Sequence, residues 1–192
     1  MEKIRVGMNK ADISTEEIPV IGTDALGPCV GVLIHSKKHK KSVVIHVSTE
    51  WKEPVVQALV LLAENNIISY DNLRKSIETL YLYDKYNLYD FDIKTKQEIL
   101  TKAGLDISPV DESLEVTIIP GYYQDNYNVA INMAKFFISL NPLTTVKRGP
   151  LPKKAVRTRM FKDLGSHEFY YNSETGKYVT EQIKDKGRPK RI

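Results

Sequence analysis

Two apolar, β-branched runs separated by a short polar segment constrain the fold of this chain most strongly. The runs are CVGVLI, residues 29–34, and SVVIHV, residues 42–47, and such residues are typical of β-strands. The segment between them, HSKKHKKS, is too polar for a core and short enough for a hairpin loop. We therefore expect the two runs to pair as antiparallel strands.

The register of this hairpin decides how the only cysteine of the chain meets a histidine. If the loop is centred between Lys37 and Lys38, Cys29 lies opposite His46, with Cβ atoms about 4.5–5.5 Å apart. A centre one residue later places Cys29 opposite Ser48 and leaves His46 on the diagonal, still on the same face of the sheet. A shift by a single register position would put the two side chains on opposite faces.

A thiol beside an imidazole can act as a nucleophile with its own base. Only the thiolate is strongly nucleophilic, and an imidazole that accepts the proton can lower the thiol pKa by several units. A third group should accept the second N–H of the ring. Candidates close in sequence are Thr23, Asp24, Ser48 and Thr49. This interpretation requires Cys29 to be exposed enough to alkylate, whereas the alternative makes it a small buried apolar residue.

The remaining pattern predicts helices in the middle of the chain and strands towards both ends. Helical spacing is found at residues 55–66, 72–82, 94–103 and 128–140, the third of these ending at Gly104. Further strands are expected at residues 3–8 and 114–120, a long loop at 141–159, and a closing hairpin with its turn at 173–176. We expect an α/β (α+β) fold, in which a mixed β-sheet or β-sandwich core is flanked by helices and both ends of the chain meet in a sheet.

Length and charge bound the organisation of the chain. Its 192 residues fit one domain over residues 1–183, followed by a basic tail at 184–192 that we expect to be disordered. The tail carries five basic residues and one acid, which equals the whole net charge of +4. A nucleic-acid-binding face spread over the domain is therefore disfavoured, and a single cysteine excludes an internal disulfide.

The sequence gives no sign of a membrane span. No apolar run is long enough to cross a bilayer, and the first residues, MEKIRVGMNKADIS, are polar where a secretory signal is hydrophobic. We expect a soluble protein that is cytoplasmic, or is secreted or translocated into a host cell without a conventional signal peptide.

The segment TDALGPCVGVLI, followed by His46, resembles the signature of the CheD-type chemoreceptor glutamine deamidases. In that family a threonine, an L-G-x-C-V element and a downstream histidine form the site. The family offsets of six residues before the cysteine and seventeen after it fall here on Thr23 and His46. IRVGMNKADISTEEIPVIGT and FYYNSETGKYVT are similar to the first strand and the closing hairpin of that family. The wider superfamily includes bacterial toxins such as the cytotoxic necrotizing factors.

The resemblance implies a CheD-like fold and a protein-glutamine deamidase. Cys29 would be the nucleophile, His46 the base and acid, and Thr23 the group that holds the imidazole. The partner would be a chemoreceptor or host protein that presents a glutamine, and no metal or organic cofactor would be needed. A cysteine hydrolase, a transglutaminase, or a non-catalytic protein-binding module on the same fold remain alternatives.

Two other features could form interaction surfaces. The loop sequence KKHKK, flanked by His35 and containing His39, could bind phosphate or a partner, although such a charge run is typical of a solvated hairpin tip. The aromatic residues Tyr81, Tyr83, Tyr86, Tyr89 and Phe91 could form a protein-binding surface or pack inside the domain.

Overall fold

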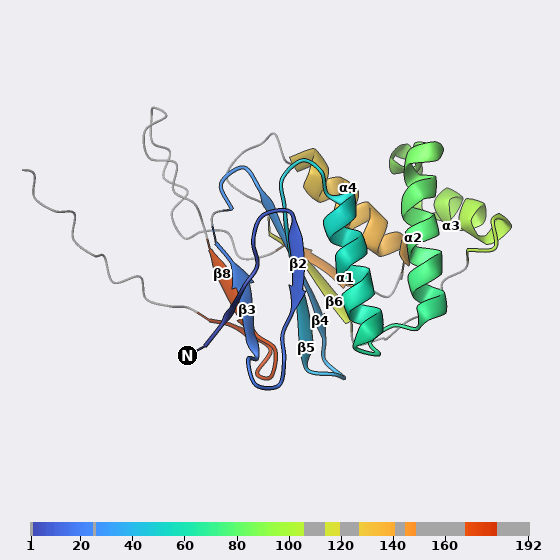
Figure 1. Ribbon diagram of the computed structural model, residues 1–192. Coiled ribbons are helices and arrows are strands. Elements are labelled where there is room, and N and C mark those ends of the chain that lie inside the picture. The colour runs from blue at the N-terminus through green and yellow to red at the C-terminus, as the bar shows by residue number, and fades with distance from the viewer. Residues whose placement is uncertain are drawn as a thin grey trace, which may run out of the picture.

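The computed structural model describes residues 2–24, 26–105, 114–119, 127–140, 145–148 and 168–179. Within these ranges two β-sheets face each other, and helices cover the outer side of the larger sheet (Figure 1). The expected α/β (α+β) class is therefore confirmed.

The smaller sheet joins the first described strand to the closing hairpin. Its order is β1-β3-β8-β9, with bounds Ile4–Arg5, Val20–Thr23, Phe169–Asn172 and Lys177–Tyr178. Strand β1 runs parallel to β3, and the other neighbours are antiparallel. The prediction that the two ends of the chain meet in a sheet is confirmed, although β1 is shorter than the predicted strand over residues 3–8.

The larger sheet has the order β2-β5-β4-β6-β7. The bounds of these strands are Lys10–Ile13, Lys41–Val47, Val30–Ser36, Leu114–Ile119 and Thr145–Arg148. Strands β4 and β5 form the predicted antiparallel hairpin. Strand β7 pairs parallel to β6, so the prediction of a loop over residues 141–159 is wrong for this strand. The rest of that stretch, His167 and the tail at 184–192 lie outside the described residues.

The hairpin register is the second of the two that the sequence allows. Val30 pairs with Val47 and Ser36 with Lys41, so the turn is centred one residue later than the first assumption, which is wrong. Lys40 has a left-handed backbone, with φ of 51°. His35 was predicted to lie in the loop because it is polar, yet it extends β4 and is buried.

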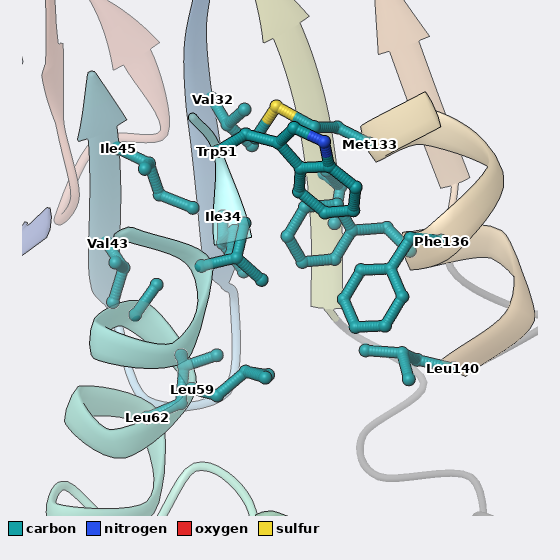
Figure 2. Packing of buried hydrophobic residues seen from close by; sticks show 14 of the residues in the cluster. Val32, Ile34, Val43, Ile45, Trp51, Leu59, Leu62, Met133, Phe136 and Leu140 are labelled. Carbon is teal, nitrogen blue, oxygen red and sulfur yellow. The ribbon is translucent and has the colours of Figure 1, made fainter. Parts of the chain in front are cut away.

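Both faces of this hairpin are buried, which explains why its sequence is apolar throughout. The face with Val32, Ile34 and Ile45 packs against α1 and α4, where Trp51 and Phe136 are among its contacts (Figure 2). The other face contains Cys29, Leu33 and Val44 and packs against the smaller sheet. Each fully buried aliphatic side chain contributes about 1.5–3 kcal/mol.

Local capping signals mark the start of two of the helices and the end of one. Their bounds are Lys52–Glu64 for α1, Tyr70–Lys85 for α2, Ile93–Lys102 for α3 and Tyr127–Leu140 for α4, with a 3-10 turn η1 at Leu88–Asp90. Ser69 and Asp92 each accept a backbone N–H at the start of α2 and α3. Gly104, with φ of 70°, ends α3 as predicted. The four predicted helices are confirmed.

The aromatic stretch of α2 and η1 divides between core and surface. Tyr83 is fully buried and lies edge-on to Tyr89 and Phe136. Tyr81 and Tyr86 are exposed. The packing role is therefore confirmed for Tyr83, whereas the binding-surface role of the exposed aromatics stays a prediction.

No described helix is long and apolar enough to cross a membrane.

Gly22 allows β3 and β8 to approach closely, and replacing it should destabilise the smaller sheet. A Cβ atom at Gly22 would lie 2.0 Å from the carbonyl oxygen of Phe169 and 2.7 Å from the Cα atom of Tyr170. Gly22→Ala is therefore expected to lower the free energy of unfolding by about 1–3 kcal/mol in urea titrations. Gly27→Ala is the matched control, because its Cβ would meet nothing within 4 Å. Equal losses in the two variants would contradict this account.

Candidate active site

A buried hydrogen bond between Thr23 and His46 joins the two sheets. Thr23 ends β3 and His46 is the penultimate residue of β5. The distance from Thr23 Oγ1 to His46 Nδ1 is 2.7 Å. The side chains are 0% and 4% exposed. The fold thus brings together two of the three residues that the sequence singles out.

The surroundings of Thr23 fix which ring nitrogen of His46 carries the proton. Thr23 Oγ1 also lies 2.7 Å from the carbonyl oxygen of Val6, which can only accept a hydrogen bond. The hydroxyl proton is therefore donated to Val6, and Oγ1 accepts the Nδ1–H of His46. In this tautomer Nε2 has a free lone pair. His46 Nε2 is buried and has no hydrogen-bond partner among the described residues.

Cys29 lies on the same sheet face as this imidazole. Gly31 is directly opposite His46 across the hairpin, and Cys29 comes two residues earlier, just before β4. Because side chains alternate along a strand, Cys29 and His46 face the smaller sheet together, on the diagonal. Diagonal neighbours in an antiparallel pair are about 7–8 Å apart.

The expectation of an open thiol is wrong for this conformation. The Cys29 side chain is 3% exposed and packs in an apolar cluster with Val6, Leu26 and Phe169. Burial raises the pKa of the thiol above its ordinary value of 9.0, whereas the sequence interpretation required a lowered one. The reason is that Leu26 folds onto the same face of the sheet as Cys29. Among residues 26–30, Pro28 alone is exposed, and it directly precedes Cys29.

The imidazole is also held uncharged. Burial lowers the pKa of His46 below 6.5, and this outweighs the opposing effects of the Val6 carbonyl and the Asp24 charge. At neutral pH the site therefore contains a neutral imidazole and a neutral thiol.

The other candidates for the third group do not orient the ring. Ser48 donates both its backbone N–H and its hydroxyl to Asn9 Oδ1, at 2.9 and 2.8 Å. Asp24 binds Arg5 at 2.6 Å near the surface. Thr49 is exposed. Among these candidates, Thr23 alone has a hydrogen bond to His46 in the described part of the chain.

Three further residues border the pair and were missed from the sequence. Val6 sets the direction of the Thr23 hydroxyl, while Gly31 and Phe169 lie on the facing strands. Phe169 Cε1 would lie 2.7 Å from a Cβ atom at Gly31. A glycine inside a strand is a known sign of close approach by another group, so Gly31 could have been recognised, but its contact in the closing hairpin could not.

His35, which precedes the basic sequence KKHKK, belongs to a different cluster. His35 Nδ1 lies 3.0 Å from Ser42 Oγ, and the ring meets Tyr171 edge-on at 5.1 Å. Lys37, in the turn, binds Glu115 at 2.6 Å. These contacts give His35 and Lys37 structural roles at the end of the hairpin that lies away from Cys29.

Comparison with known proteins adds no family to the geometry of this site. No protein-family model matches the chain, and no curated protein matches its sequence. Within the described ranges no group of three or more His, Cys, Asp or Glu residues could hold a metal ion. What the geometry provides is a buried, tautomer-fixed imidazole with a cysteine on the same face, an arrangement suited to acyl transfer through sulfur.

The neutral state of His46 predicts how stability depends on pH. Burial lowers the pKa values of His46 and His35 in the folded protein, so the unfolded chain takes up more protons below pH 6.5. The free energy of unfolding should therefore fall on acidification, by up to about 1.4 kcal/mol per pH unit for each histidine. Urea titrations at several pH values measure this slope. His46→Gln should reduce it, and an unchanged slope would show that His46 is not held neutral.

Proposed function

We propose that this chain is a cysteine-dependent protein-glutamine deamidase, which converts a glutamine side chain of another protein to glutamate with release of ammonia. The observation that carries the proposal is the 2.7 Å contact of Thr23 with His46 Nδ1, together with the unpartnered Nε2. A ring held in this way is poised to accept a proton. The resemblance of the Thr23, Cys29 and His46 spacing to the CheD-type deamidases supports the same chemistry.

Each proton and bond in the proposed reaction is assigned to a residue of the site. His46 Nε2 takes the proton of Cys29 while the sulfur attacks the carboxamide carbon. The carbon–nitrogen bond then breaks, and His46 returns the proton to the departing ammonia. Water, activated by the same nitrogen, hydrolyses the thioester to glutamate and restores the thiol. Thr23 keeps the ring in one tautomer throughout, as an orienting group does in a catalytic triad.

The substrate and setting follow from the same proposal. The partner would be a folded protein that presents a glutamine, either a chemoreceptor or a protein of a host cell. The chain would act in the cytoplasm, or in a host cell after translocation. No step in this reaction needs a metal or an organic cofactor.

The second candidate is a non-catalytic protein-binding module. The observation that favours it is the burial of Cys29, which is 3% exposed and has a raised thiol pKa. In such a module Cys29 would be a core residue, and exposed aromatics such as Tyr81 and Tyr86 would make the contacts. A module of this kind would leave its partner chemically unchanged.

Comparison of modified proteomes tests the proposed activity. The active chain should produce glutamine-to-glutamate changes detectable by mass spectrometry in a bacterial or host-cell extract. Cys29→Ala should abolish them, and His46→Gln should lower the rate by roughly 100-fold or more. Thr23→Ser, which keeps the hydroxyl, should retain more activity than the similarly sized Thr23→Val.

The products separate the alternatives. Cleaved peptides would indicate a cysteine hydrolase, and an added amine would indicate a transglutaminase. Full activity in Cys29→Ala would contradict any mechanism through this sulfur. No modified product with any form of the chain would favour the binding module.

A further inference from the structure

A missing side chain leaves a gap in the sheet directly opposite the candidate base. Gly31 pairs with His46 in the hairpin and has no Cβ atom to cover the strand. The space is filled from outside the hairpin. A Cβ at Gly31 would lie 2.7 Å from Phe169 Cε1 and 3.1 Å from Leu26 Cδ1.

Leu26 is the part of this arrangement that no strand pairing holds. It lies in the connection between β3 and β4 and is therefore outside either sheet ladder. Its side chain is 0% exposed. Phe169, in contrast, belongs to β8 and pairs with Thr23. Displacing Leu26 would break no strand pairing, whereas displacing Phe169 would disturb the smaller sheet.

The groups around this position are those that a reacting carboxamide needs. Cys29 precedes Gly31 by two residues on the same face, and His46 lies across from Gly31 with Nε2 buried and unpartnered. Leu26 lies on this face of the hairpin too, because its Cδ1 would be 3.1 Å from a Cβ atom at Gly31, the residue opposite His46.

We propose that the space above Gly31 and beside the Phe169 ring, which the Leu26 side chain takes up at rest, is the binding slot for the glutamine side chain of the substrate. This inference rests on the proposed function. Substrate binding would move Leu26 out of the slot, so that opening of the slot and exposure of Cys29 are one event.

The shape of the slot fits an unbranched side chain with a terminal carboxamide. The aliphatic stem of glutamine would lie over the bare backbone of Gly31 and against the ring of Phe169. Its carboxamide would then reach the level of Cys29 and His46. Leu26 has an aliphatic body of similar bulk to that stem, which explains how it can take the same place.

Alkylation of Cys29 by iodoacetamide tests the slot directly, because this small reagent carries the same primary carboxamide as glutamine. Leu26→Ala should raise the alkylation rate of the folded chain by about tenfold or more, since the closed form no longer excludes the reagent. Leu62→Ala is the matched control. It makes the same truncation at a leucine that is 2% exposed and lies on α1, on the far side of the larger sheet. Its rate should stay near that of the unaltered chain after both are corrected for stability in urea.

A volume-conserving variant makes the test specific to this side chain. Leu26→Met refills the space with a side chain of similar volume and should keep alkylation near the rate of the unaltered chain. Equal acceleration by Leu26→Ala and Leu62→Ala would overturn the proposal, because the thiol would then be reached by general unfolding. So would a Leu26→Met variant that is as fast as Leu26→Ala. If Leu26→Ala does not fold, Leu26→Val gives the same comparison with a smaller expected change.

The outcome is separable from that of the deamidase proposal. Alkylation needs no protein substrate. Faster alkylation in Leu26→Ala without any glutamine-to-glutamate product would support the slot and contradict the deamidase proposal. Deamidation with unchanged alkylation in Leu26→Ala would support the deamidase proposal and contradict the slot.

Discussion

The hydrogen bond between Thr23 and His46 is the interaction on which the rest of the site depends. It is a polar link between two sheets whose facing surfaces are mostly apolar around Cys29. Buried polar groups in proteins are almost always hydrogen-bonded, and Val6 completes the chain by accepting the Thr23 hydroxyl. Val6, which follows β1, and Thr23 at the end of β3 thereby hold the imidazole of the β4–β5 hairpin in one orientation.

Among the described residues this arrangement leaves one buried side-chain polar atom unsatisfied. A buried group without a partner costs about 1–3 kcal/mol, and His46 Nε2 is such a group among the described residues. The stabilisation that offsets it comes from the two apolar faces of the β4–β5 hairpin. The same packing that holds the ring neutral also buries the thiol, so both groups are uncharged for the same physical reason.

Much of the fold could be predicted from the sequence because local signals specify it. The apolar runs around HSKKHKKS predict the hairpin, and the periodicity of residues 128–140 predicts α4. The register was ambiguous since the turn has no Asn-Gly or similar signature and Lys40 adopts a left-handed conformation. The strand at Thr145–Arg148 was missed because it is short and pairs in parallel at the edge of the larger sheet. At the site, Thr23 and His46 were predicted. A buried Cys29 was one of two alternatives, which the sequence could not separate because the burial depends on a cluster with Leu26 and Phe169 that no local pattern encodes.

The protonation of the His46 ring is the most direct test of this account. Long-range proton–nitrogen NMR correlations on the folded chain at neutral pH distinguish the two tautomers and the charged ring. The account predicts a neutral ring with its proton on Nδ1 and a bare Nε2, and loss of that single tautomer in Thr23→Val. A proton on Nε2, or a doubly protonated ring at neutral pH, would contradict it.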